Sequence, residues 1–507
     1  MNEFVQPMIG GLHILANPMI WVYITIGTII GVIVGALPGI GTTQAYGLCL
    51  PFTFMMTPVN AISLLMGITV GNQFGNSIPA ILIGLPGSPS AILTVIEGYT
   101  MQKRGEGGLA LGVTFVASLG GQFVSILFFV LLVVPLMQAA YIFMQPEQFA
   151  IYLFGLVAIS SITGKNVIKG LASAAFGVGI GLVGLDPVNL IPRFDFGFRA
   201  VRSGFETTAV MIGLLAVSEL FRSARQSFQW RPATGVEAAL TTRFPAWRKW
   251  KRTLPFMLFG TIVGTLLGAV PGAGGTAPTM VSYQWAQFFS KKPEEFGHGS
   301  IDGIAANESA QNASNCGELI PTLALGIPSS GSMVFLLGAL TVHGFIPGPM
   351  LIRQAPHLFY ATIAGLLGST VLLAITGWYM CSLMLKAVTI NRQSVIIFAL
   401  ATVVIGVYST NLKVFDVFVA LAAGGIGYFM MGYGYSCAAA ALGVILGSGL
   451  ERNLRHGLNI TDGSFLKLLA RPITGITVAL CLVVLGYGVY RQIQLRKKLA
   501  KMAEKPA

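Results

Sequence analysis

Residues 4–96 contain no Asp, Glu, Lys or Arg. Such a stretch cannot present a solvated surface, and apolar runs of about 20 residues, the length that a helix needs to cross a bilayer, recur beyond it. Hydrophobic residues make up 54% of the 507 and charged residues only 10%, against about 25% charged residues in soluble domains. The sequence therefore predicts an all-α polytopic membrane protein with about 10–12 transmembrane helices.

The positive charges are concentrated between the predicted spans and at the C-terminus. The net charge is +13, and residues 221–254 hold eight Lys or Arg against a single Glu. Basic loops of this kind are typical of the cytoplasmic face of a membrane protein, so the charge indicates topology and no nucleic-acid partner. The sequence predicts a first transmembrane repeat (1–222), a basic cytoplasmic linker (223–253), a second transmembrane repeat (254–490) and a basic cytoplasmic tail (491–507).

One stretch occurs twice. Residues 27–43, GTIIGVIVGALPGIGTT, match residues 260–276, GTIVGTLLGAVPGAGGT, at ten of 17 positions when the numbering is shifted by 233. Glycines at four-residue spacing leave one helix face smooth, so that another helix can approach closely. The Pro-Gly-x-Gly that follows each stripe ends the helix. We therefore expect two tightly packed helices that both end in an irregular turn.

A second repeated element follows each stripe. Residues 78–86, IPAILIGLP, match residues 320–328, IPTLALGIP, at an offset of 242, and small hydroxyl residues come next in both copies. Prolines and glycines at membrane depth predict broken or re-entrant helical hairpins. Paired helix breaks at corresponding positions of two halves indicate a transporter's central binding site.

The two halves are predicted to be inverted relative to each other. Residues 1–20 contain no Lys or Arg, so the first half is expected to begin outside the cytoplasm. The second half begins directly after the basic linker and therefore inside.

The predicted breaks supply donors for an anion. The stretches 39–96 and 319–352 contain no Lys or Arg, so free N–H groups at helix starts and nearby hydroxyls are the donors that remain. The alternative is that these residues only cap broken helices. The predicted substrate-binding residues are Gly39, Gly41, Thr42, Thr43, Gly87, Ser88, Ser90, Gly272, Gly274, Gly275, Thr276, Ser329, Ser330, Gly331 and Ser332.

Glu308 lies in an amide-rich patch, NESAQNASN, just before the second break. A carboxylate inside a membrane is costly and is a functional candidate. It could hold Na⁺ through oxygen ligands or carry a proton, whereas the alternative is a solvated loop. Its first-half counterpart is taken to be the neutral patch 71–76, and Glu97 is interpreted as a charge at the membrane surface. The predicted ion-coupling residues are Asn72, Asn76, Asn307, Glu308 and Asn312.

These motifs resemble the large membrane subunit of the tripartite tricarboxylate transporter family. The resemblance covers roughly residues 15 to 485 and includes GALPGIGTTQAYGLCLPFTF, IGLPGSPSAILTVIEGYTMQKRGEGGLALG, NESAQNA and LIPTLALGIP. It implies a permease of the bacterial inner membrane that works with a small four-helix membrane subunit and a periplasmic solute-binding protein. It also implies uptake of di- or tricarboxylates coupled to Na⁺ or H⁺.

The chain departs from the family pattern at the predicted site. Asn307 precedes Glu308 where the family usually has proline, Gln311 precedes Asn312 where it has an Asn-Asn pair, and Ser329 follows Pro328 where it has glycine. The particular carboxylate is therefore left unassigned.

Other classes of protein were weighed against a secondary transporter. HExxH, GxSxG and phosphate-binding loop motifs are absent from the sequence, so it predicts no enzyme and no cofactor besides the coupling ion. A carboxylate channel, a membrane scaffold or an enzyme subunit of a larger complex are the alternatives.

Overall fold

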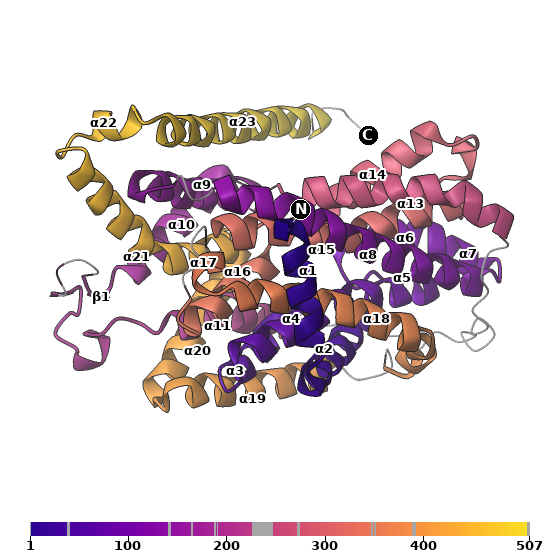
Figure 1. Ribbon diagram of the computed structural model, residues 1–507, viewed down its shortest axis with the longest axis horizontal. Helices are drawn as coiled ribbons and strands as arrows, with labels where there is room; N and C mark the ends of the chain where they lie inside the picture. Colours follow the sequence, from indigo (N-terminus) through magenta and orange to yellow (C-terminus); the bar gives the residue numbers. More distant parts are fainter. Residues whose placement is uncertain are drawn as a thin grey trace.

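The chain forms long helices that lie side by side, mostly along the horizontal direction of Figure 1. The computed structural model describes residues 2–37, 41–139, 143–163, 166–186, 189, 191–225, 247–270, 274–345, 348, 351–387 and 392–503, some of them, including Arg353, by their backbone only. Within these residues the strands are β1 (Gly184–Leu185) and β2 (Pro192–Arg193), which pair antiparallel.

Helices account for almost all of the remaining secondary structure. The N-terminal part contains α1 (Asn2–Leu15), α2 (Pro18–Ala36), α3 (Thr42–Thr53), α4 (Pro58–Gly75), α5 (Ser77–Ile83), η1 (Pro89–Ala91), α6 (Ile92–Thr94), η2 (Val95–Tyr99), α7 (Thr100–Lys103), α8 (Gly107–Ala139), α9 (Gln145–Thr163), α10 (Val167–Gly181), η4 (Arg199–Val201), α11 (Thr207–Ile212), η5 (Gly213–Val217) and α12 (Ser218–Arg225). The C-terminal part contains α13 (Trp247–Gly268), α14 (Thr276–Phe289), η7 (Pro293–Glu295), α15 (Ile301–Leu325), α16 (Gly331–Val342), α17 (Leu351–Gln354), α18 (Pro356–Ala387), α19 (Arg392–Asn411), α20 (Val414–Gly432), α21 (Cys437–Ile460), α22 (Phe465–Leu469) and α23 (Pro472–Ala503).

Five helices of the described chain are long and apolar enough to cross a membrane. They contain the spans Pro18–Ala36, Gly107–Leu136, Pro356–Tyr379, Val414–Gly432 and Pro472–Tyr490. Some of the other apolar helices are shorter; α10, for example, has 15 residues. The fold is that of an all-α polytopic membrane protein, while the count of 10–12 spans stays a prediction.

The glycine stripes pack against helix backbones. A Cβ atom added at Gly31 of α2 would lie 2.4 Å from the carbonyl oxygen of Ile68 in α4. One added at Gly264 of α13 would lie 2.4 Å from the carbonyl oxygen of Ala310 in α15. The same close approach occurs at Gly27, Gly35, Gly260 and Gly268. The packing predicted for the stripes is therefore confirmed, and their partners are α4 and α15.

Helices α4 and α15 pack antiparallel where they meet. Hydrogen bonds join Gln73 to Asn315 (2.8 Å), Asn76 to Gln311 (2.9 Å) and Ser77, at the start of α5, to Glu308 (2.9 Å). Residue numbers rise along one helix as they fall along the other, which is the signature of antiparallel packing. Although α15 is rich in polar side chains, nearly every position from Asp302 to Ala324 is buried.

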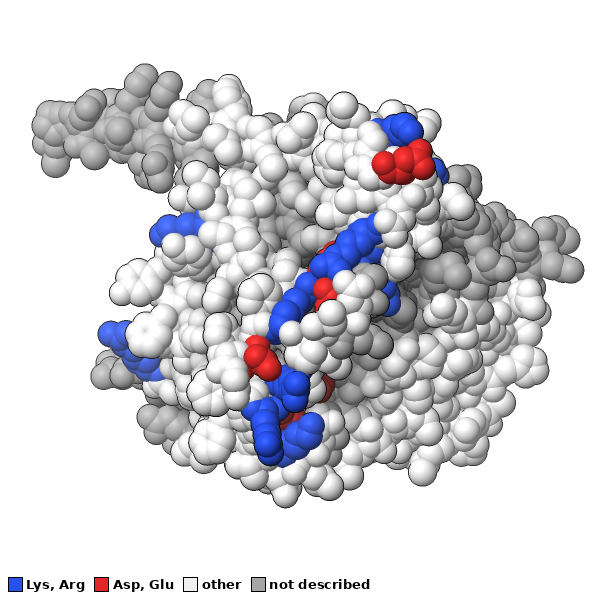
Figure 2. Space-filling view, turned by 90° about the vertical axis from the view of Figure 1, so that its left-hand side faces the viewer, with Lys and Arg blue, Asp and Glu red and all other residues white. Residues whose placement is uncertain are grey.

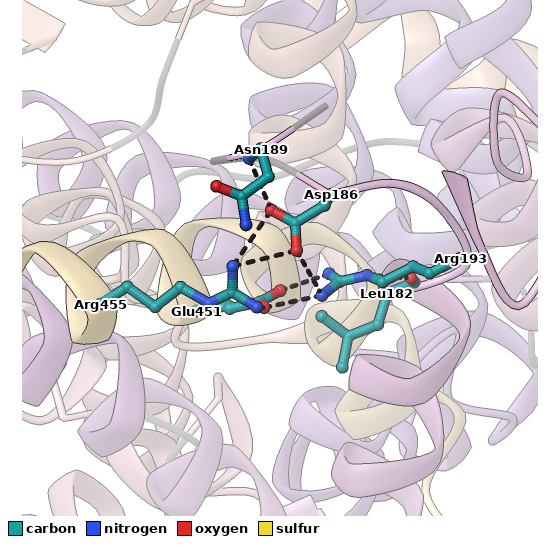
Figure 3. A network of polar contacts seen from close by, with 6 residues as sticks. All are labelled: Leu182, Asp186, Asn189, Arg193, Glu451 and Arg455. Atoms are coloured by element: carbon teal, nitrogen blue, oxygen red, sulfur yellow. Dashed lines mark hydrogen bonds and ion pairs between the residues drawn. The ribbon is translucent and has the colours of Figure 1, made fainter. Parts of the chain in front are cut away.

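A charged cluster fixes the loop that contains β1 and β2 to α21 (Figure 3). Arg193 donates to Asp186 (3.1 Å) and to both carboxylate oxygens of Glu451, and Arg455 pairs with the same two acids. The hydrogen bonds from Arg193 hold the pKa of Glu451 below its usual value, so this carboxylate is ionised at neutral pH. On the face shown in Figure 2, many of the charged side chains form a diagonal band, and a few others lie at the upper right and on the left.

Glu97 is buried, which corrects its interpretation as a charge at the membrane surface. Its carboxylate accepts hydrogen bonds from the backbone N–H groups of Gly297 (2.6 Å), Gly299 (2.7 Å) and Ser300 (2.7 Å), and from the hydroxyl of Tyr283. It therefore ties η2 to the segment that leads into α15.

Candidate functional site

Both helix breaks begin in the same way. Gly84 ends α5 with φ 70° and Gly326 ends α15 with φ 73°, a left-handed conformation that favours glycine. The next N–H group turns back in each copy, from Leu85 to the carbonyl of Pro79 (3.3 Å) and from Ile327 to that of Pro321 (3.2 Å). This is the helix C-cap described for left-handed glycines.

Ser88 and Ser330 occupy the N-cap positions of the helical segments that follow the breaks. Neither side chain caps its own helix. Ser88 instead accepts a hydrogen bond from Asn76 (2.9 Å), and Ser330 donates one to Glu318 (2.6 Å). For these two serines the reading as simple caps is therefore wrong. We call residues 84–88 the first tip and residues 326–330 the second tip.

Each tip meets the other half of the chain. A Cβ atom at Gly331, the first residue of α16, would lie 3.1 Å from the hydroxyl of Thr43 in α3. One at Gly275, before α14, would lie 3.5 Å from the Cβ of Ser90 in η1. Four helix starts thus come together in two crossed pairs, one at each tip.

Four amides, Gln73, Asn76, Gln311 and Asn315, form a buried cluster where α4 crosses α15. Asn72 lies beside this cluster and accepts a hydrogen bond from Thr42 (2.9 Å). Several buried donors in and around it have no partner in the described structure. They are Nδ2 of Asn72, Nδ2 of Asn315 and the hydroxyl of Ser329 in the second tip. An unpaired buried donor is costly, so these groups indicate a ligand with acceptor atoms.

Glu308 is fully buried on α15 and is surrounded by hydroxyls. Both of its carboxylate oxygens accept from Ser77 (2.9 Å each), one also from Thr94, and the other from Ser118 (3.2 Å). Asn307 donates to Thr94 (2.7 Å), while its own Oδ1 has no partner in the described structure. Carboxylate, hydroxyl and amide oxygens are the ligands of hard cations, and the solvated-loop alternative for Glu308 is wrong.

The predicted ion-coupling residues are only partly brought together. Asn76 and Glu308 share Ser77 as a hydrogen-bond partner, and Asn307 reaches Glu308 through Thr94. Asn312 donates to the backbone oxygen of Glu308 (3.0 Å), whereas Asn72 bonds to Thr42 instead. Among the predicted substrate-binding residues, Gly39 and Gly272 lie outside the described residues.

The sequence interpretation missed Glu318 and the hydroxyls around Glu308. It also assigned the wrong counterpart to Glu308: the offset of 242 places Met66 opposite it and places Asn76 opposite Glu318. The contacts of Ser88 with Asn76 and of Ser330 with Glu318 follow this offset. The sequence therefore contained the signal: extending the alignment of IPAILIGLP with IPTLALGIP towards the N-terminus pairs Asn76 with Glu318.

Arg193 is one of two arginines in the loops that could in principle reach into the site and bind an anion. In the structure it is bound to Asp186 and Glu451 at the loop–α21 contact (Figure 3), and its N–Hε donates to the carbonyl of Leu182 (3.0 Å). The cluster contains two acids and two arginines and is therefore neutral. The guanidinium of Arg193 is already paired with carboxylates of the protein. The second arginine that could bind the anion is Arg353, whose side chain lies outside the described part of the structure.

Fold and site together define a polytopic α-helical membrane protein with paired helix breaks around a buried polar centre. Residues 21–442 match the tripartite tricarboxylate transporter TctA family, and the chain belongs to this family. It is a component of a tricarboxylate-type transporter.

Two relatives from Agrobacterium vitis are similar to the chain. The first, described as an uncharacterised 52.8 kDa protein in the TAR-I ttuC' 3' region, is 34% identical over 487 residues, 96% of each chain. The second, described as an uncharacterised protein in the TAR-II ttuC' 3' region, is 37% identical over 224 residues, which are 43% of this chain and 91% of the relative. No solved structure matches the chain.

Proposed function

We propose that this chain is the permease subunit of a binding-protein-dependent secondary transporter that takes up di- and tricarboxylates. Its proposed partners are a small four-helix membrane subunit and a periplasmic solute-binding protein, and its proposed location is the bacterial inner membrane. Membership of the family supports the partners. The basic segment 221–254 supports a cytoplasmic connection between the halves.

The observation that carries this proposal is the set of unpaired donors in and around the amide cluster and in the second tip. Within the described residues, Nδ2 of Asn72, Nδ2 of Asn315 and the hydroxyl of Ser329 are buried without acceptors, and residues 39–96 and 319–352 contain no Lys or Arg. Helix starts and neutral donors can compensate a carboxylate without a basic side chain. Two crossed pairs of helix starts suit a substrate with more than one carboxylate.

The spacing of the tips supports a small polycarboxylate. Asn76, which is bonded to Ser88 of the first tip, is also hydrogen-bonded to Gln311, and Glu318, which is bonded to Ser330 of the second tip, lies seven residues further along α15. This separation corresponds to about 10 Å along the helix axis. A four-carbon dicarboxylate of about 6 Å, with a hydrogen bond of about 3 Å at each end, has a comparable length.

Glu308 and the surrounding hydroxyls are the proposed site of the coupling cation, and we assign Na⁺ to it. Ser77, Thr94 and Ser118 would contribute hydroxyl oxygens, and the unpartnered Oδ1 of Asn307 an amide oxygen. Such hard oxygen ligands suit a small cation. A cation here would also compensate the buried carboxylate.

The antiparallel crossing of α4 and α15 supports an inverted internal repeat. The stripe glycines of α2 and α13 correspond at an offset of 233, and the residues that they contact in α4 and α15 correspond at an offset of 242. The corresponding helices α4 and α15 run in opposite directions. Inverted halves around a central site are the architecture in which alternating access is achieved by moving one part against another. This arrangement favours a transporter over a channel.

Uptake of labelled succinate, malate and citrate tests the proposed function. Membrane vesicles that contain the chain and its partner subunits should accumulate at least one of them when a Na⁺ or proton gradient is imposed. Collapsing the gradients with ionophores should abolish accumulation. Accumulation that persists without any gradient would contradict secondary transport.

Opposite labelling of the two halves tests the inversion. Cysteines introduced as Asn2→Cys and Leu240→Cys should react with a membrane-impermeant thiol reagent from opposite sides of the membrane. Native Cys49, Cys316, Cys437 and Cys481 are buried and should give a low background. The fifth native cysteine, Cys381, is replaced by serine in both variants. Labelling from the same side would favour a parallel repeat.

Glu308→Gln should weaken the dependence of uptake on Na⁺. The amide keeps the shape but removes the charge that would attract the cation, so we expect the Na⁺ concentration for half-maximal uptake to rise at least about tenfold. The control is Glu294→Gln, which replaces an exposed carboxylate in η7. This control should leave the Na⁺ concentration for half-maximal uptake unchanged. Equal Na⁺ dependence in the two variants would remove Glu308 from the cation site.

A further inference from the structure

Glu318 is a buried carboxylate that the Na⁺ site does not use. Its side chain is 4% exposed, and Ser330 is its hydrogen-bond partner at 2.6 Å. No Lys or Arg of the described chain forms an ion pair with it. Ser329, next to Ser330 in the second tip, keeps a buried hydroxyl without a partner. A carboxylate with this environment has little to compensate a negative charge.

The first tip shows that the break itself does not need a carboxylate. The position that corresponds to Glu318 is Asn76, which donates a hydrogen bond to Ser88, whereas Glu318 accepts one from Ser330. The two serine pairs are also alike, with Ser88 2.7 Å from Ser90 and Ser330 3.0 Å from Ser332. The acidic group is thus an additional property of the second tip.

This carboxylate conflicts with an anion at the same tip. Because Ser330 lies 2.6 Å from Glu318, a substrate oxygen bonded to Ser330 would lie about 5 Å from Glu318. Repulsion between two negative charges at that distance, at an effective dielectric constant of about 20, would reduce affinity by about two powers of ten. The conflict disappears when Glu318 is neutral.

We propose that Glu318 binds a proton together with the carboxylate substrate at the second tip, so that the permease carries a proton as well as its cation. This inference rests on the proposed function. One O–H bond forms on the Glu318 carboxylate with a proton from solvent, and it breaks again when substrate and proton leave on the other side. The substrate itself is unchanged. By linkage, substrate binding favours protonation and protonation favours substrate binding to the same degree.

The other ionisable groups around Glu318 are few. Tyr46 of α3 interacts with it electrostatically and donates to the carbonyl of Leu65 (3.0 Å), and Cys49 lies on the same helix. Helices α4, α5, α8 and α16 contain no acidic or basic residue. The remaining groups on elements packed against α15 are Glu97, Tyr99, Trp247–Arg252 of α13, Tyr283 and Arg353, together with Asp302, Glu308 and Cys316 on α15 itself.

The dependence of succinate uptake on pH tests this inference. Between about pH 6.5 and pH 8.5, the wild-type KM should rise with pH by up to about tenfold per pH unit, because binding must first draw a proton onto Glu318. Glu318→Gln and Glu318→Asn should have a KM that changes less than about twofold over this range. Both variants should retain Na⁺ dependence.

Calorimetry provides a second readout that needs no transport. Succinate binding to the purified permease should take up about one proton in the wild type and about none in Glu318→Gln, as measured in buffers of different ionisation enthalpy. A wild-type pH profile in both variants, or no proton uptake by the wild type, would overturn the inference. If the wild type showed Na⁺-dependent uptake with a KM that does not change with pH, the inference about Glu318 would be wrong and the proposed function would stand. If no gradient drove uptake, the proposed function would fail.

Discussion

Gly31→Leu and Gly264→Leu are each expected to abolish assembly of the permease. An added Cβ atom at either position lies 2.4 Å from a backbone carbonyl oxygen of the partner helix, Ile68 in α4 or Ala310 in α15. Because the obstacle is backbone, no side-chain rotation can relieve it. Overpacking of a core costs about 1–3 kcal/mol where side chains can adjust, and here the helices must separate.

The helices in question carry the site. Moving α4 displaces the amide cluster, and moving α15 displaces Glu308 and Glu318 together. We therefore expect loss of folded protein and of uptake for both leucine variants, and an intermediate effect for Gly31→Ala. The control is Gly179→Leu, since a Cβ atom added at Gly179 of α10 has nothing within 4 Å beyond its chain neighbours and the backbone of its own helix.

The measurements are the yield of monodisperse detergent-solubilised protein, its thermal unfolding, and uptake per inserted molecule. Wild-type values for Gly31→Leu and Gly264→Leu would show that the two stripes do not hold α2 on α4 and α13 on α15. Equal losses in Gly179→Leu would show that leucine is harmful at any helical glycine of this protein.

Much of the fold could be predicted from periodicity and composition. The glycine stripes and the breaks at Gly84 and Gly326 depend on local chemistry: close helix approach, and a left-handed residue that lacks a Cβ atom. What the stripes packed against could not be predicted, because α4 and α15 are polar or punctured by prolines and do not look like packing partners. A helix of a partner subunit could equally have packed against the glycine stripes.

The site was predicted less completely because its members come from distant segments. Glu97 stands near Lys103 and Arg104, so it looked like a surface charge, yet its partners are N–H groups of residues 297–300. Glu308 attracted attention through its amide-rich neighbours, whereas Glu318 sits among apolar residues and was overlooked. Only the three-dimensional contact with Ser330 shows its relation to the tip.

Loss of single hydroxyls at the tips and helix starts is expected to weaken substrate affinity strongly. Each hydrogen bond to a charged group contributes about 1.5–3 kcal/mol, so KM should rise by roughly one to two powers of ten. The variants are Ser88→Ala, Ser330→Ala, Thr43→Val and Thr276→Val. Thr43 and Gly331 belong to the same crossed pair, so Thr43→Val and Ser330→Ala should have similar effects.

Buried hydroxyls that only bond to their own helix provide matched controls. Thr362 donates to the carbonyl of Leu358 (3.0 Å) and Ser369 to that of Gly365 (2.6 Å), both within α18. Thr362→Val and Ser369→Ala should change KM by less than about twofold. If they raise KM as much as the tip variants do, the effect reports general loss of stability.

The central claim is that neutral donors at the helix starts hold the carboxylate. It is tested most directly by measuring the uptake KM of Ser88→Ala, Ser330→Ala, Thr43→Val and Thr276→Val beside Arg193→Gln and Arg353→Gln, at equal amounts of inserted protein. The four hydroxyl variants are predicted to raise KM by about ten- to hundredfold, while the two arginine variants stay within about twofold of the wild type. If only the arginine variants lose affinity, the anion is held by ion pairing and the claim is wrong.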